Sequence, residues 1–161
     1  RKANMIYDKI KIYVNKRVAN ILNKDADSFE FYKKDGITPN KNAFLTSLLL
    51  NYSDEFRKKQ QTLYDKIKSS IQAKTRIDEN SIQELCFDIA EKVNKEFATD
   101  ETEKFDCLIS LKPTKESQPI IDYIEEYLLN GSSLSEYFRN MFSSYASYTQ
   151  DKREEIIFKP Q

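Results

Sequence analysis

The feature that most constrains this chain is its lack of turn residues, because 161 residues include two glycines and four prolines. β-sandwiches, β-barrels and Rossmann-type sheets need many more glycines and prolines for their hairpins and phosphate loops. The sequence therefore predicts a mostly helical protein. Its length suits one domain of ordinary size or two very small ones.

Several kinds of chemistry are disfavoured by the composition. The chain has no histidine, which is the commonest general base and metal ligand. Cys86 and Cys107 form no Cys-x-x-Cys pair, so we expect two buried thiols in a reducing, cytoplasmic environment. The given sequence shows no glycine-rich phosphate loop, no nucleophile elbow, no signal-peptide pattern and no apolar run of the ~20 residues that a membrane span needs. We expect no enzyme, no cofactor and no metal.

Charge is distributed unevenly along the chain. Residues 1–80 hold 17 Lys and Arg against 10 Asp and Glu, whereas residues 81–161 hold 9 against 16. The first half therefore carries +7 and the second −7, although the net charge of the chain is zero. One half is suited to face a polyanion, or the two halves simply attract each other.

The first half begins with a strand pattern. Over residues 9–14, Ile10, Ile12 and Val14 alternate with Lys9, Lys11 and Tyr13, which is typical of a half-exposed strand. Helical spacing follows from Lys16, and the Gly36 region is expected to stop that helix in a left-handed cap. Thr38 as N-cap and Pro39 at the first position then predict a second helix of more than 30 residues.

The second half returns to the same order after a third amphipathic helix over residues 79–97. A strand is predicted over residues 106–112 and a helix over 116–129, which Asn130 and Gly131 stop. Ser132 and Ser133 are expected to cap a further helix with aromatic and aliphatic anchors. When the two halves of the sequence are aligned, residues 10–14 match residues 107–111 at an offset of 97 positions, and Gly36 matches Gly131 at an offset of 95. Such an internal repeat determines the architecture.

The repeated unit resembles the ribbon-helix-helix (MetJ/Arc-like) DNA-binding family. The resemblance is carried by residues 9–14 and 36–45 in the first copy and by residues 131–139 in the second. It gives one repeat over 8–56, an extended and a connecting helix over 57–98, a second repeat over 105–150, and a tail over 151–161. It implies that the two strands pair antiparallel within one chain, as an intrachain pseudo-dimer.

In that family the ribbon enters the major groove of double-stranded DNA, so the resemblance implies a bacterial transcription regulator. The base-facing positions would be Lys9, Lys11 and Tyr13, with Leu108, Ser110 and Lys112 in the second copy. The phosphate-binding positions would be Thr38, Asn40, Ser132 and Ser133. The second strand departs from the pattern, because Leu108 carries no hydrogen-bonding group and Asp106 repels phosphate.

Three alternatives stay open. The lysine face of the first strand can be an ordinary solvated surface, and the fold can serve as a protein-interaction module without DNA contact. The long helix and its neighbour, residues 39–73 and 79–97, can pair with each other as a hairpin turning near residues 74–78, or with a second chain. Residues 148–158 also resemble the stretch leading into a WYL domain. With Arg1 as the first residue, this suggests a piece of a longer protein.

Overall fold

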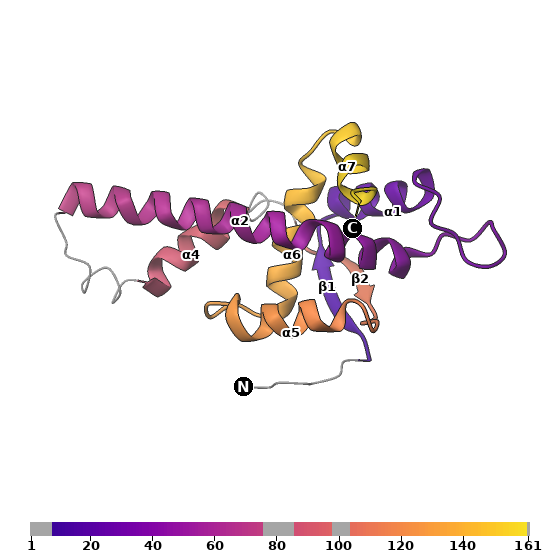
Figure 1. The fold of residues 1–161 in the computed structure, drawn as a ribbon, viewed down its shortest axis with the longest axis horizontal. Coiled ribbons are helices and arrows are strands. Elements are labelled where there is room, and N and C mark those ends of the chain that lie inside the picture. The colour runs from indigo at the N-terminus through magenta and orange to yellow at the C-terminus, as the bar shows by residue number, and fades with distance from the viewer. Residues whose placement is uncertain (1–7, 76–85, 98–103, 161) are drawn as a thin grey trace.

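The computed structural model describes residues 8–75, 86–97 and 104–160, and this part of the chain contains six helices and a two-stranded sheet (Figure 1). In chain order the elements are β1 (Ile10–Val14), α1 (Lys16–Ser28), α2 (Lys41–Thr75), α4 (Cys86–Phe97), β2 (Cys107–Leu111), α5 (Gln118–Tyr127), α6 (Leu134–Ala146) and α7 (Gln150–Ile157). The mostly helical fold predicted from the composition is confirmed. Among the described helices, none is long and apolar enough to cross a membrane.

The two strands form an antiparallel ribbon, as the sequence predicted. Ile10 pairs with Leu111, Ile12 with Ile109 and Val14 with Cys107, so the ribbon joins segments about a hundred residues apart. The inward side chains of β1 are 0–5% exposed, because they face the helices. Alternation along a strand then necessarily turns the remaining side chains to the opposite, outer face.

One core unites the two halves of the chain. The proximal part of α2 and the whole of α6 supply most of its large side chains, and rings from the two helices meet edge to face. The ring centroids of Phe44 and Tyr145 are 6.1 Å apart, and those of Phe56 and Tyr137 are 5.4 Å apart. Burying each such ring contributes roughly 1.5–3 kcal/mol, so neither half keeps its core without the other.

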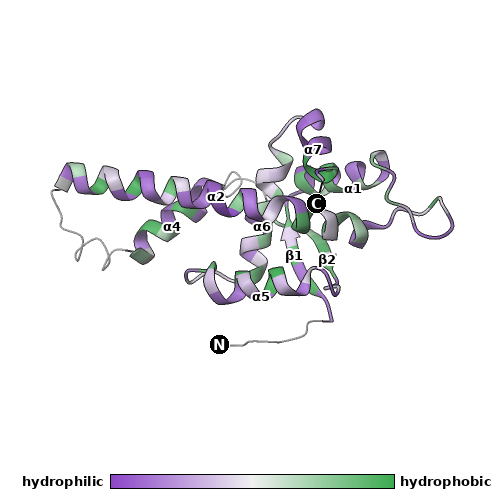
Figure 2. Ribbon diagram, viewed as in Figure 1, coloured by the Kyte–Doolittle hydropathy of each residue, from purple (hydrophilic) through white to green (hydrophobic). Residues whose placement is uncertain are grey.

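Helix α2 extends beyond this core, and α4 folds back along it (Figure 1). The distal apolar residues of α2, Leu63, Ile67 and Ile71, are half-buried, while Ile89 and Val93 of α4 are buried. In Figure 2 this distal part alternates between apolar and polar residues. Helix α4 therefore lies along α2, as the predicted helical hairpin requires. The rest of the predicted turn and the start of the predicted second helix, residues 76–85, lie outside the described residues.

The ends of α1 and α2 differ from the prediction. Helix α1 ends at Ser28, and Glu30, not Gly36, takes the left-handed conformation after it with φ of +63°. Phe31 N–H binds the carbonyl of Ala26 and Glu30 N–H that of Asp27, which is a Schellman cap. Gly36 also has positive φ, +73°, but it lies in the following loop.

Helix α2 begins at Lys41, so the prediction of Thr38 as N-cap and Pro39 as first residue was wrong. Asn40 is the N-cap, and its Oδ1 accepts a bond from the N–H of Ala43 at 3.1 Å. The N–H and hydroxyl groups of Thr38 instead bind the carboxylate of Asp35. These two groups donate to Asp35, three positions earlier, because the bonds complete a tight turn.

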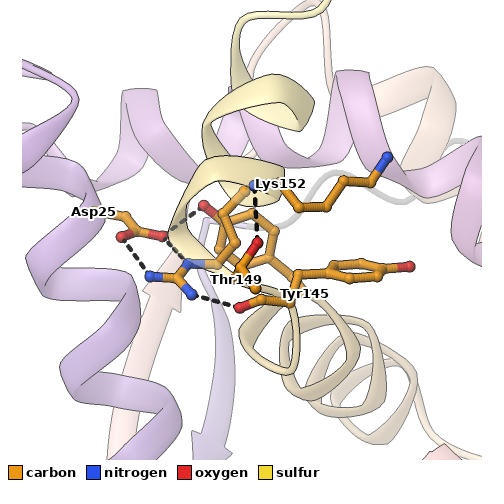
Figure 3. Close-up of polar contacts among 6 residues, drawn as sticks. Asp25, Tyr145, Thr149 and Lys152 are labelled. Atoms are coloured by element: carbon orange, nitrogen blue, oxygen red, sulfur yellow. Dashed lines mark hydrogen bonds and ion pairs between the residues drawn. The ribbon is translucent and has the colours of Figure 1, made fainter.

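The C-terminal segment, interpreted from sequence as a tail, contains the helix α7. Its Arg153 is buried with Asp25 of α1: Nε lies 2.7 Å from Oδ2, and Nη2 lies 3.3 Å from Oδ1 (Figure 3). The Tyr145 hydroxyl donates to the same carboxylate at 2.7 Å, and burial raises the pKa of this phenol, which keeps it protonated. The hydrogen bond to Asp25 likewise raises the pKa of the Arg153 guanidinium. This cluster fixes α7 against α1 and α6.

Candidate functional site

The outer face of the ribbon gathers the side chains that the sequence predicted to contact bases. All six are exposed: Lys9, Lys11, Tyr13, Leu108, Ser110 and Lys112. The register places Lys11 opposite Ser110 and Tyr13 opposite Leu108. Continued by one position, it places Lys9 opposite Lys112. We call these six side chains the ribbon face.

Charge on the ribbon face changes along the strands. The three lysines gather toward one end, whereas the other end carries Tyr13 and Leu108, which are 45% and 47% exposed. Lys9 and Lys112 face each other, and like charges in that position destabilise a ribbon unless an anion lies between them. The basic end is therefore the part of the face best suited to an anionic ligand.

Acidic side chains stand beside each strand. Asp8 precedes β1 and Asp106 precedes β2, and both are exposed. The Cys107 Sγ lies 3.6 Å from Oδ1 of Asp106. Desolvation, together with the charge of Asp106, raises the pKa of this thiol, which favours the protonated form near neutral pH.

Helices from opposite halves of the chain hold the ribbon at its outer edges. On the β1 side, Ser135 Oγ donates to the carbonyl of Lys11 and Arg139 Nε to that of Tyr13, both at 2.7 Å. The Arg139 guanidinium also lies 4.2 Å from the centroid of the Phe105 ring. The sequence pattern did not single out Ser135 and Arg139, although residues four positions apart share one face of a helix.

On the β2 side a single residue makes the corresponding contact. The Asn42 side chain accepts from the N–H of Lys112 at 2.8 Å and donates to its carbonyl at 3.0 Å. Helix α2 follows β1 in the chain but binds β2, and α6 follows β2 but binds β1. The starts of both helices are thus fixed beside the ribbon.

The four residues predicted to bind phosphate are in different situations. Asn40 and Ser133 are the N-caps of α2 and α6, and Ser133 Oγ accepts from the N–H of Glu136 at 3.1 Å. The Ser132 hydroxyl donates to the carbonyl of Leu129. These three side chains lie at or just before the two helix starts that flank the ribbon.

Thr38 is the exception among the predicted phosphate ligands. Its hydroxyl and N–H, with the N–H of Ile37, hold the Asp35 carboxylate. The hydrogen bond from the Thr38 hydroxyl lowers the pKa of Asp35 most, and with the two backbone bonds brings it to about 2. An ionised carboxylate thus already occupies the donors of Thr38, so Thr38 is poorly suited to bind a phosphate.

A second polar cluster joins α2 to the end of α6. The Tyr52 hydroxyl lies 2.7 Å from Ser144 Oγ, and Lys59 Nζ donates to the Tyr148 hydroxyl at 2.6 Å. Tyr148 in turn donates to the carboxylate of Glu55 at 3.2 Å. Burial raises the pKa of Tyr52 and keeps the phenol neutral. These contacts connect two core helices, and we assign them a structural role.

No group of three or more His, Cys, Asp or Glu able to hold a metal ion occurs among residues 8–75, 86–97 and 104–160. No protein-family model, curated protein or solved structure is significantly similar to this chain. The exposed ribbon and the helix starts beside it are therefore the candidate functional site.

Proposed function

We propose that this chain binds double-stranded DNA through the ribbon face and acts as a transcription regulator. The observation that carries the proposal is an exposed antiparallel ribbon, complete within one chain, whose outer face bears Lys9, Lys11 and Lys112. The major groove, about 12 Å wide, admits a two-stranded ribbon. Lysine ammonium groups can then donate to guanine O6 and N7 or to phosphates.

The flanking helix starts support the same proposal. Asn40 and Ser133 cap α2 and α6, and the hydrogen bonds of Asn42 and Ser135 to the ribbon hold these helix starts beside it. A helix N-terminus attracts phosphate through its N–H groups and its dipole. A ribbon in the groove would bring these two helix starts toward the phosphates on its two sides.

We further propose that the two halves are ribbon-helix-helix repeats forming an intrachain pseudo-dimer. The support is the exchange of contacts, in which the second helix of each half binds the strand of the other half. Such a unit presents two strands with different side chains. Because Lys11 is opposite Ser110, one strand would then specify its bases more strongly than the other.

The test begins by selecting bound duplexes from a pool of randomised double-stranded DNA. Binding of the selected duplex is then measured by fluorescence anisotropy at one fixed salt concentration. The Lys11→Ala substitution should weaken binding at least several-fold, since a good base contact contributes ~1–3 kcal/mol, and Ser110→Ala should change it little. Affinity should also fall with salt, with a log–log slope near −0.9 per phosphate contacted. Equal losses in both variants, or no binding by the parent chain, would overturn the proposal.

A protein-interaction module without DNA contact is the second candidate. The observation that favours it is exposed aromatic surface on α5, where Tyr123 and Tyr127 are 48% and 62% exposed with ring centroids 5.0 Å apart. Tyrosines with one face free are enriched in interfaces. Binding to a protein partner that Tyr123→Ser/Tyr127→Ser abolishes, without any DNA binding by the parent, would favour this candidate.

A further inference from the structure

The two outer edges of the ribbon are not equivalent. Along β1, the carbonyls of Lys11 and Tyr13 point outward and are bound by side chains of α6. In an antiparallel pair, facing residues point their backbone groups the same way with respect to the ladder, either inward or outward. Ser110 faces Lys11 and Leu108 faces Tyr13, so their N–H and C=O groups must point away from β1 as well.

The bonds of Lys112 support this assignment independently. The N–H and carbonyl of Lys112 point away from β1 and bind the Asn42 side chain. Ser110 and Leu108 lie two and four residues before Lys112, so their backbone groups point in the same direction. Within the described part of the chain, the outward backbone groups of Leu108 and Ser110 have no hydrogen-bond partner. β2 therefore has a free edge two residues long, whereas the equivalent edge of β1 is covered.

A cavity of about 600 Å³ lies along this free edge. One wall is formed by Asp106 and residues 107–110 of β2, and the other walls come from α1 and the first turns of α2. Its floor is the edge of the core, where Ala19, Leu22, Phe44 and Leu45 are each 1–6% exposed. The volume falls within the range of roughly 300–1,000 Å³ that is usual for binding clefts.

We propose that this edge of β2 binds an extended peptide segment of another protein, which adds a third strand to the ribbon. Free N–H and C=O groups at both Leu108 and Ser110 repeat every two residues, which matches the hydrogen-bonding period of an added strand. Side chains of such a strand alternate, so every second one would meet the apolar lining of the cavity. Main-chain bonds and this lining together define the site.

The charges around the cavity specify the ends of the peptide. Lys16 follows β1 and lies at the Cys107 end of β2, because Val14 pairs with Cys107. Lys41 precedes Asn42, which binds Lys112, and so lies at the opposite end. Both lysines line the cavity, against the single carboxylate of Asp106. The partner is therefore an extended segment with aliphatic residues at alternate positions and acidic residues at its ends.

The test uses a defined probe, the peptide Glu-Val-Thr-Val-Thr-Val-Glu with blocked ends and a fluorophore. The full chain should bind it saturably, and hydrogen exchange at the Leu108 and Ser110 amides should slow in the complex. A peptide N-methylated at two successive central residues loses one donor that faces β2 in either strand direction, and should bind at least about tenfold more weakly. The Lys16→Glu/Lys41→Glu variant should bind the original peptide about tenfold more weakly.

The matched control is Lys24→Glu, which makes the same charge reversal on α1 at an exposed position outside the cavity. It should leave peptide affinity unchanged. Absence of saturable binding, or binding without protection of the Leu108 and Ser110 amides, would overturn the proposal. Protection of these amides that grows with protein concentration in the absence of peptide would assign the edge to a second copy of this chain instead. None of these readouts depends on whether the ribbon face binds DNA.

Discussion

Removing Arg153 should be among the most destabilising single changes in this protein. The Asp25 side chain is fully buried and that of Arg153 is 8% exposed, so their charges are shielded from water. In an Arg153→Met variant, Asp25 would keep the single hydrogen bond from Tyr145. Leaving one partner of a buried ion pair uncompensated costs about 3–5 kcal/mol. That is a large fraction of the roughly 5–15 kcal/mol by which a domain of this kind is stable.

The assay is urea unfolding followed by circular dichroism, with the free energy of unfolding taken from the linear extrapolation. The double variant Asp25→Leu/Arg153→Met should recover part of the loss, because apolar side chains replace the buried ion pair but the buried Tyr145 hydroxyl loses its acceptor. The neighbouring Lys152→Met is the control. Its side chain is 43% exposed and lies 3.9 Å from Glu155, so its loss should stay below about 1 kcal/mol. A loss below 1 kcal/mol for Arg153→Met, or strict additivity in the double variant, would refute this account of the cluster.

Two further predictions concern the loop between α1 and α2. Glu30→Gly should raise the free energy of unfolding by roughly 0.5–1 kcal/mol in the same urea assay, since glycine takes the left-handed cap conformation without strain. Thr38→Val removes the hydroxyl donor to Asp35 and should raise the pKa of that carboxyl from about 2 toward its ordinary value, measured by NMR titration. Because the folded-state pKa is the lower one, the stabilising contribution of Asp35 is present above the unfolded value near 4. It is lost as the pH falls toward 2, and an unchanged titration in Thr38→Val would contradict this.

The ribbon could be predicted from sequence because its signal is local. A strand with one buried face repeats every two residues, so Ile10, Ile12 and Val14 separate from Lys9 and Lys11 without knowledge of the fold. The pairing of the two strands was a further step, which the resemblance to the ribbon-helix-helix family implied. The N-cap Ser133 was a local signal too, whereas α5 ends at Tyr127, before the predicted stop at Asn130 and Gly131.

The predictions that were wrong concern residues whose donors are engaged by a neighbour, or whose partner lies far away in the sequence. Thr38 satisfies every local rule for an N-cap, but Asp35 engages its donors and leaves the cap to Asn40. The sequence pattern assigns Arg153 to a charged tail, since nothing near it in sequence reveals its partner, Asp25, which lies 128 residues away. Such complementarity becomes visible only when α1 and α7 are placed side by side.

The charge asymmetry between the halves of the chain does not carry over to the ribbon. Each strand comes from a different half, yet both contribute lysine at one end, through Lys9 and Lys112. Both also contribute an apolar side chain at the other end, where Tyr13 faces Leu108. The positive charge of the ribbon face therefore changes along the strands, from the Lys9 end to the Tyr13 end. The charges of the two strands differ at one facing pair, Lys11 and Ser110. A polyanion lying across the ribbon face would meet most of the positive charge of this face at the Lys9 end.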